Sequence, residues 1–391
     1  MKTLLAPLAL LCLIAGNVSG EINKAELADL LKKFPKADTN GDGRLSEDEA
    51  TAQRKKLTRR STRPRRGVKR TFKVDPGWTA DRFPEHAMCY RTPDELKKIH
   101  PKVVSYDKPT DGALRIVATG HSFMVPGFKV LPTICELAGF KQPLHTHTGG
   151  GMTGSARYKW EEENGIFQFE GKPKPKLLTS IANAEWDAMM WGPYFQDRSE
   201  YYACWVDYGL KYHPHMKFFL SDAWPSIQSL DKKPQSEEEL THELFARLEK
   251  ERQAPYRAIM TTLNAKYPDK VFILPTSAAM VLAVDYYHRG KLPGIEGIHS
   301  AVGKKERSLW RDPLGHLGPG FDRLEGYVFY ATIYGKSPEL LKEDVSIDDK
   351  PGTFPTRALD NVFRKIAWQA VINNPLSGVT DKDGDGVRDT L

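Results

Sequence analysis

Five short apolar runs, separated by helical patterns, constrain the fold of this 391-residue chain more than any other feature. The runs end at glycine, proline or acidic residues, as strands buried on both faces of a sheet do. Strands that alternate with helices form parallel sheets, because each crossover between parallel strands needs a long connection. The sequence therefore predicts an α/β domain with a doubly wound, five-stranded parallel sheet. Its predicted strands are 113–118, 142–147, 183–191, 216–222 and 270–275.

The helical patterns between and after these runs complete the prediction. They lie at 128–139, 198–212, 236–267, 278–289, 324–333 and 359–371. Sheets of this kind place their sites just beyond the carboxyl ends of the strands. Aromatic residues crowd the loops after the third and fourth strands, where they could stack on a sugar ring, although at least half are expected in the core. They are Trp186, Trp191, Tyr194, Trp205 and Trp224.

A serine and a distant acid–histidine pair carry the candidate chemistry. Ser122 follows the first predicted strand in Gly120-His121-Ser122, at a strand-to-helix turn that would expose its hydroxyl. Far downstream stands Asp312-Pro-Leu-Gly-His316. If the three side chains converge, His316 can take the hydroxyl proton while Asp312 fixes the imidazole tautomer. Each also has an ordinary alternative: Ser122 as a helix cap, His316 as a loop histidine and Asp312 as the start of a turn.

These motifs resemble those of the SGNH (GDSL-like) hydrolases over roughly residues 114–375. Gly120-His121-Ser122 stands where that family has Gly-Asp-Ser or Gly-Asn-Ser, and residues 312–338 resemble its last block. The resemblance implies a flavodoxin-like fold and an esterase, lipase or carbohydrate deacetylase that needs no metal for its chemistry. It also implies Ser122 as nucleophile, His316 as general base and acid, and Asp312 as its orienting partner.

The same resemblance implies an oxyanion hole, formed by the backbone N–H of Ser122 and by that of Gly150 or Gly151. Two departures from the family pattern stand out. The family spaces its last two residues D-x-x-H, whereas this chain has D-x-x-x-H. The family's third-block Asn is also replaced, because Trp191-Gly192-Pro193 occupies that place. Loss of a third donor could cost about 10²–10³ in rate.

A twelve-residue segment, 38–49, matches the EF-hand calcium loop. Calcium takes six to eight oxygen ligands, and Gly43 permits the sharp turn in the loop. Helices are expected at 24–34 and 46–57, so residues 21–53 are predicted to form a small helical EF-hand module. The predicted calcium ligands are Asp38, Asn40, Asp42, the Arg44 carbonyl, Ser46 and Glu49. An acidic turn without metal is the alternative.

The C-terminal segment, 376–391, contains a second such pattern, because residues 381–389 repeat the first nine positions of the loop and the sequence stops at Leu391, one short of the twelfth. This segment resembles the truncated calcium loops of dockerin-like and thrombospondin-type repeats, with water expected in the gap. The predicted ligands are Asp381, Asp383, Asp385, the Val387 carbonyl and Asp389. A frayed acidic tail is the alternative. Extracellular modules bind calcium at roughly 10⁻⁴–10⁻³ M, so calcium outside the cell would keep the N-terminal loop occupied even at modest affinity. We therefore interpret calcium as a structural ion.

Residues 1–20 are typical of a secretory signal, with Lys2, a short apolar run and small residues before Glu21. The run is too short to span a bilayer, and no later stretch is long enough. Residues 54–72 are predicted to be a basic linker, because segment 54–70 holds ten Arg or Lys and no acid. It could bind an anionic polymer or serve as a solvated spacer. Of the four cysteines, three follow the signal, so at least one is expected to stay free or to pair between chains.

These features predict a secreted or periplasmic calcium-binding protein with an SGNH-like serine esterase domain at 73–375. Its substrate would be an extracellular ester, such as acyl groups on a polysaccharide. The alternative is a catalytically impaired, calcium-stabilised carbohydrate-binding or matrix protein.

Overall fold

The computed structural model describes most of the chain beyond residue 90 and part of the segment 27–50. The described residues are 27–28, 31–32, 35–40, 42–46, 48–50, 89, 91–148, 157–159, 161–162, 172–192, 197–222, 224–347 and 354–389. The chain divides into two compact units, Met1–Lys73 and Val74–Leu391. The predicted signal at 1–20 and the predicted linker at 54–72 lie outside the described residues.

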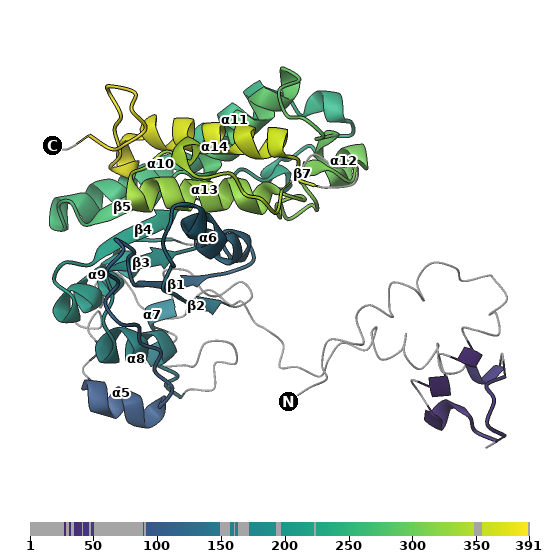
Figure 1. Cartoon of the computed structure of the whole chain (residues 1–391), viewed down its shortest axis with the longest axis horizontal. Helices are drawn as coiled ribbons and strands as arrows, with labels where there is room; N and C mark the ends of the chain where they lie inside the picture. The colour runs from purple at the N-terminus through teal and green to yellow at the C-terminus, as the bar shows by residue number, and fades with distance from the viewer. Residues whose placement is uncertain are drawn as a thin grey trace. The chain divides into compact units, whose positions relative to one another are not determined.

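The second unit is built on a five-stranded parallel sheet, as the sequence predicts (Figure 1). Its strand order is β2-β1-β3-β4-β5, the order of flavodoxin-like folds. Such sheets carry their sites where the strand order reverses, here between β1 and β3. The strands are β1 (Ile116–Gly120), β2 (Leu144–Thr148), β3 (Ala188–Trp191), β4 (Lys217–Ser221) and β5 (Val271–Leu274).

Helices cover both faces of this sheet (Figure 1). On one face lie α6 (Val125–Leu137), α11 (Thr276–His288), α13 (Phe321–Tyr334) and α14 (Arg357–Ile372). On the other lie α5 (Pro93–Ile99), α7 (Arg157–Lys159), α8 (Lys176–Asn183) and α9 (Ser199–Tyr212). The long helix α10 (His242–Lys266) contributes side chains to both layers. Short 3-10 helices lie at Pro35–Ala37, Ile227–Ser229, Glu237–Glu239, Pro338–Leu340 and Pro375–Ser377.

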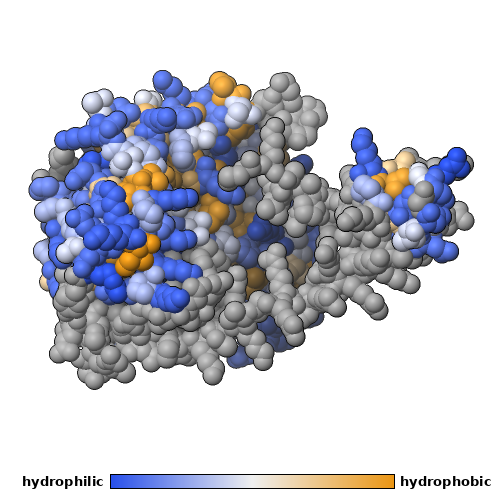
Figure 2. Space-filling view, turned by 90° about the horizontal axis from the view of Figure 1, so that it is seen from below, coloured by the Kyte–Doolittle hydropathy of each residue, from blue (hydrophilic) through white to orange (hydrophobic). Residues whose placement is uncertain are grey.

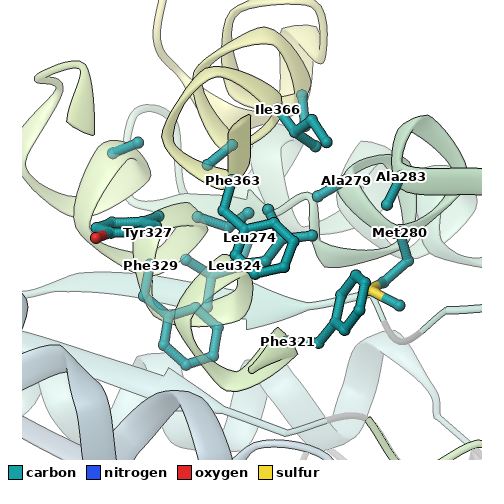
Figure 3. Close-up of a cluster of buried hydrophobic side chains, with 14 of the residues drawn as sticks. Leu274, Ala279, Met280, Ala283, Phe321, Leu324, Tyr327, Phe329, Phe363 and Ile366 are labelled. Atoms are coloured by element: carbon teal, nitrogen blue, oxygen red, sulfur yellow. The ribbon is translucent and has the colours of Figure 1, made fainter. Parts of the chain in front are cut away.

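Alternation along each strand divides the core into two clusters. On β1, Ile116 and Ala118 join the cluster under α13 and α14, while Val117 joins the cluster under α8 and α9. Both faces are covered, which explains why β1, β3, β4 and β5 are mostly apolar, whereas β2, at the edge of the sheet, carries His and Thr. Figure 3 shows the first cluster, where Phe321 and Phe363 pack beside Leu274. Each fully buried side chain of this size contributes roughly 1.5–3 kcal/mol. On the surface, hydrophilic residues predominate over the described part of the face in Figure 2.

A close contact between α6 and α13 sets the spacing of the two segments that carry the candidate site. A Cβ at Gly127 would lie 2.5 Å from the ring of Phe329, and one at Gly326 would lie 2.5 Å from Val130. The glycines therefore let the two helices approach closely. The N–H of Gly127 donates to the buried Glu325 carboxyl at 2.7 Å, which links the helices directly. The beginning of α6 and the beginning of α13 are thereby fixed next to each other.

The structure corrects two parts of the prediction. Residue 183 does not belong to the third strand, because Asn183 ends α8 and β3 begins only at Ala188. A second, two-stranded parallel sheet was also not predicted. It pairs β6 (Gly297–His299) with β7 (Ser308–Trp310), and α12 (Ser300–Gly303) connects them. Strands of three residues are too short to show an alternating pattern.

Within the described part of the chain, no helix has both the length and the apolar character to span a membrane. Three cysteines lie among the described residues, and all three are buried free thiols. Burial raises the pKa of Cys89 to about 11, and it raises the pKa of Cys135 and of Cys204 further. These thiols therefore remain protonated and unreactive near neutral pH.

Candidate functional site

The turn between β1 and α6 presents Ser122. The carbonyl of His121 accepts hydrogen bonds from Met124 N at 2.9 Å and from Val125 N at 3.1 Å, which starts the helix. The residue that caps α6 is Met124, and no side chain caps this helix. Ser122 is exposed and free of a capping role. A Cβ at Gly120 would lie 2.8 Å from Met124, so the tight turn requires glycine there.

The second segment is a compact turn between β7 and α13. Arg311 N donates to the carbonyl of His316 at 2.9 Å, and Gly315 N donates to the carbonyl of Asp312 at 2.9 Å. Gly315 has a φ of 90°, a left-handed conformation that favours glycine. The Asp312 carboxylate also accepts from Leu314 N at 3.1 Å and from His316 N at 3.3 Å. The turn therefore accommodates the extra residue of D-x-x-x-H without separating its two ends.

The three predicted side chains meet. His316 Nε2 lies 2.8 Å from Ser122 Oγ, and His316 Nδ1 lies 2.7 Å from Asp312 Oδ2. When the Nδ1 proton faces the carboxylate, Nε2 is left to accept the proton of the Ser122 hydroxyl. A serine, an imidazole and a carboxylate from positions up to 194 residues apart thus form one hydrogen-bonded chain.

Asp312, the acid at the end of this hydrogen-bonded series, is held ionised. Partial burial raises the pKa of Asp312, but hydrogen bonds from the N–H and the ring of His316 outweigh burial, and the net pKa lies below its ordinary value. The guanidinium of Arg311, 3.7 Å away, acts in the same direction. At neutral pH the group is a carboxylate, which can stabilise a positive charge on the neighbouring imidazole.

Ser122 and His316 open into a cleft of about 840 Å³. Basic and acidic side chains line it, Lys129 and Arg311 with Glu306 and Asp322. Burial raises the pKa of Asp322, although Arg323 and Lys129 oppose the increase. Sequence reasoning did not identify these residues, because a charged side chain in a loop or at a helix start is usually a solvated surface group. The other lining residues are His121, Val125, Pro126, Thr148, Ser300, Leu317, Gly318, Pro319 and Gly320.

The predicted oxyanion donors Gly150 and Gly151 lie outside the described residues. At the end of β3, Trp191 is fully buried and stacks on Phe218, so its side chain belongs to the core. Gly192 N donates to Thr119 O at 2.8 Å and extends the sheet. The four described tryptophans expected either to stack on a sugar or to pack in the core, Trp186, Trp191, Trp205 and Trp224, are all buried.

In the segment 38–49, side chains at alternate positions accept hydrogen bonds from the backbone of the same loop. Asp38 Oδ2 accepts from Gly43 N at 2.9 Å, and Asn40 Oδ1 accepts from Asp42 N at 3.1 Å. Asp42 Oδ1 accepts from Arg44 N at 2.8 Å. Gly43 has a φ of 77°, as the sharp turn requires. The chain is helical at 27–28, 31–32 and 48–50, on either side of the loop.

Glu49 closes this loop. Its Oε1 accepts from Thr39 N at 2.8 Å, and its Oε2 accepts from Ser46 N at 3.0 Å. The Thr39 hydroxyl, followed by the other donors of Thr39 and Ser46, lowers the pKa of Glu49 to about 2. Leu45 is buried against Ala37 and Ala50, which gives the small unit its apolar centre.

The C-terminal segment repeats this pattern of hydrogen bonds. Asp381 Oδ2 accepts from Gly386 N at 3.2 Å, and Asp385 Oδ1 accepts from Val387 N at 2.7 Å. The N–H of Lys382 donates to the carboxylate of Asp389 at 3.2 Å. The equivalent N–H of the first loop, that of Thr39, donates to Glu49. The ninth-position aspartate therefore accepts the bond that the twelfth-position glutamate accepts in the first loop.

The C-terminal loop is bound to the α/β unit and does not form a frayed tail. Ser337 N donates to Gly386 O at 2.7 Å, and Arg388 N donates to Gly335 O at 2.7 Å. The indole N–H of Trp368 donates to Asp381 Oδ2 at 3.0 Å. Carboxylate oxygens of Asp381, Asp383 and Asp385 lie within 4.8 Å of one another. These oxygens suit a hard cation such as calcium.

Comparisons with known proteins are sparse. No family model matches the chain, and no curated protein matches it. Among solved structures, a DUF4886 family protein from Bacteroides uniformis aligns with a TM-score of 0.44 and 14% sequence identity. The alignment covers 67% of this chain and 95% of that protein.

Proposed function

We propose that this chain is a serine ester hydrolase of the SGNH (GDSL-like) kind. The observation that carries the proposal is the hydrogen-bonded chain from Ser122 through His316 to Asp312, with distances of 2.8 and 2.7 Å. The hydroxyl at its end is exposed in a cleft, where a substrate can reach it. A serine bonded to a histidine that is itself oriented by a carboxylate is the arrangement that activates a hydroxyl nucleophile.

In the acylation step, Ser122 Oγ attacks the carbonyl carbon of the ester while its proton passes to His316 Nε2. The carbonyl oxygen becomes an oxyanion, for which we propose the N–H groups of Ser122 and of Gly150 or Gly151 as donors. Asp312 stabilises the imidazolium that has formed. When the intermediate collapses, the C–O bond breaks and His316 returns the proton to the leaving alcohol. The product is an acyl ester on Ser122.

In the deacylation step, water replaces the alcohol. His316 takes a proton from the water, and the resulting hydroxide attacks the acyl carbon. The bond to Ser122 Oγ then breaks, and the serine regains its proton from His316. The released product is the carboxylic acid. Both steps need only side chains of this chain and water.

The cleft favours a polar substrate. Two basic and two acidic side chains, Lys129, Arg311, Glu306 and Asp322, line it, and a long apolar acyl chain would cover these polar groups at a cost in desolvation. A volume of about 840 Å³ lies in the range of small-molecule sites. We therefore propose a short acyl ester on a polar alcohol, such as a polysaccharide hydroxyl.

Hydrolysis of p-nitrophenyl acetate by the wild type and by Ser122→Ala tests the proposal. We expect Ser122→Ala to lose roughly 10³-fold or more of kcat/KM. Ser180→Ala is the matched control, because its hydroxyl also lies 3.3 Å from a histidine ring nitrogen, that of His147, but is buried in α8. If both variants hydrolyse the ester like the wild type, the chain is not a serine esterase. A calcium-stabilised carbohydrate-binding or matrix protein would then be the better description.

We also propose that calcium is a structural ion of this protein. All the predicted ligand atoms in the two loops are oxygens, which calcium prefers. Asp38, Asn40, Asp42, the Arg44 carbonyl, Ser46 and Glu49 would hold it in the first loop. Asp381, Asp383, Asp385, the Val387 carbonyl and Asp389 would hold it in the second. Bound there, the ion would neutralise clustered carboxylates and fix the ends of each loop.

The remaining proposals concern the N-terminal segments, which lie outside the described residues. We propose a secreted or periplasmic location from the signal-like residues 1–20, and an anionic polymer as partner of residues 54–70. Binding to a sulfated polymer that weakens with salt, and that disappears when 54–70 are deleted, would support the second proposal. Binding that does not depend on salt would contradict it.

A further inference from the structure

The turn that carries Asp312 and His316 receives a hydrogen bond from a distant tryptophan. The indole N–H of Trp224, in the loop after β4, donates to the carbonyl of Gly315 at 2.6 Å. Trp224 is 4% exposed, and Gly315 is buried. The bond therefore satisfies a buried carbonyl at the residue immediately before His316.

A second contact runs from the same tryptophan to the imidazole through Phe123. The ring centroid of Phe123 lies 5.4 Å from that of Trp224 and 5.0 Å from that of His316. Phe123 directly follows Ser122 in the chain. Trp224 thus contacts the turn directly at Gly315. Its link to the imidazole of His316 is indirect, because the ring of Phe123 packs between the two. It is not among the residues that line the cleft.

We propose that Trp224 is a positioning residue that holds His316 in line between Ser122 and Asp312. The inference rests on the proposed esterase function. Without the indole N–H, the Gly315 carbonyl would be buried and unpaired, which is costly. The turn would relax toward water, and Asp312 and His316 would move with it. A displacement of about 1 Å in catalytic groups can cost up to about 10²-fold in rate.

The main variant is Trp224→Phe, which keeps an aromatic ring and removes the N–H. We expect kcat for p-nitrophenyl acetate to fall about tenfold with KM little changed, because the tryptophan does not line the cleft. Trp186→Phe is the matched control. Its indole N–H also donates to a buried backbone carbonyl, that of Ser180 at 2.9 Å, but Trp186 lies before the amino end of β3, whereas Trp224 follows the carboxyl end of β4. We expect this control to lose stability and to keep the wild-type kcat.

A spectroscopic measurement separates positioning from packing. The proton between His316 Nδ1 and Asp312 should give a far-downfield proton NMR resonance, identified by its loss in Asp312→Asn. In Trp224→Phe we expect that resonance to shift or broaden, whereas in Trp186→Phe it should not change. If Trp224→Phe does not fold, replacing Trp224 by benzothienylalanine keeps the shape of the ring system and removes only the N–H.

The outcomes are distinct. A normal kcat together with an unchanged resonance in a folded variant that lacks the N–H would overturn the positioning role. Absence of Ser122-dependent hydrolysis in the wild type would reject the esterase. The resonance would still decide the positioning role: a change on loss of the N–H supports it, and no change overturns it.

Discussion

Two carboxylates of the α/β unit, Asp312 in the cleft and Asp222 in the interior, differ in burial and in partners. Asp222 follows β4 directly and is fully buried. It accepts from Thr276 Oγ1 at 3.0 Å, from Ser277 N at 2.9 Å and from Gln253 Nε2 at 2.8 Å. Burial raises the pKa of Asp222 to about 6 despite these donors.

Asp312 has a side chain that is 33% exposed, and its pKa lies below the ordinary value. Its main partner is an imidazole that also contacts a hydroxyl, so a change at this carboxylate reaches the atom that we propose as the nucleophile. The donors to Asp222 are neutral and belong to α10 and α11, so this carboxylate joins structural elements. The donors to a carboxylate therefore distinguish the chemical role proposed for Asp312 from the structural role of Asp222.

The largest expected effect is on activity at the exposed carboxylate. Asp312→Asn should lower kcat by roughly 10³–10⁴-fold, because an amide facing Nδ1 favours the wrong tautomer of His316. The melting temperature should change little. Steady-state hydrolysis and thermal unfolding of one preparation measure both quantities. Asp285→Asn, which loses a surface ion pair with Arg289, serves as control. A loss of less than tenfold would remove the chemical role assigned to Asp312.

The next effect should be on stability at the buried carboxylate. Asp222→Asn should lower the free energy of unfolding by about 1–3 kcal/mol, because its amide cannot accept from all three donors. The folded fraction should keep the wild-type kcat. Urea unfolding, followed by a kinetic assay in buffer, tests both expectations. Unchanged stability together with lost activity would reverse the roles of the two carboxylates.

The pH dependence of stability should be smaller and should also distinguish the two sites. The folded pKa of Asp222 is about 6, and burial together with repulsion from Asp222 raises that of Glu249 to about 7. Because these values exceed the unfolded ones, the folded state holds extra protons between about pH 4 and pH 7. The stability from these groups is full below that window and is lost as pH rises through it. Unfolding free energies measured from pH 4 to 8 should therefore fall less steeply in Asp222→Asn than in the wild type. Parallel curves would contradict this assignment.

A third arrangement, the gathered carboxylates of the C-terminal loop, should show the smallest effect. Calcium at about 1 mM should stabilise the protein by only ~1 kcal/mol if the affinity is that of an extracellular module. Trp368 is a built-in reporter, because its indole donates to Asp381. We expect its fluorescence to change on titration with calcium in the wild type and not in Asp381→Asn. Identical titrations in both proteins would exclude calcium binding at this loop.

Much of the fold could be predicted because β1, β3, β4 and β5 are apolar on both faces. The predicted third strand begins too early, at 183. The buried residues Leu177, Leu178 and Ile181 follow a helical spacing, and the helix to which they belong, α8, continues to Asn183. The two strands of the small sheet were missed because each has only three residues.

The candidate site was predictable only in part. Ser122, Asp312 and His316 could be selected because their residue types and their position beside strand and helix ends indicate the chemistry. The hydrogen bonds made by Trp224 and Glu325 could not be predicted, although Trp224 itself stood out as an aromatic residue in a loop after a strand. A buried indole N–H that meets a carbonyl 91 residues away, or a carboxyl that meets Gly127 N, leaves no local pattern in a sequence.

The cleft draws its two walls from different parts of the chain, and this has an evolutionary consequence. Ser122 and Lys129 come from β1–α6, whereas Ser300, Glu306 and Arg311 come from the small β6–β7 unit and its flanks. That unit is attached to the rest of the protein by Glu237, which accepts from Ile298 N at 2.7 Å. Mutations in it can reshape what the cleft admits while Ser122, His316 and Asp312 stay in place. Under the proposed function, new specificities can therefore arise here without a change in Ser122, His316 or Asp312.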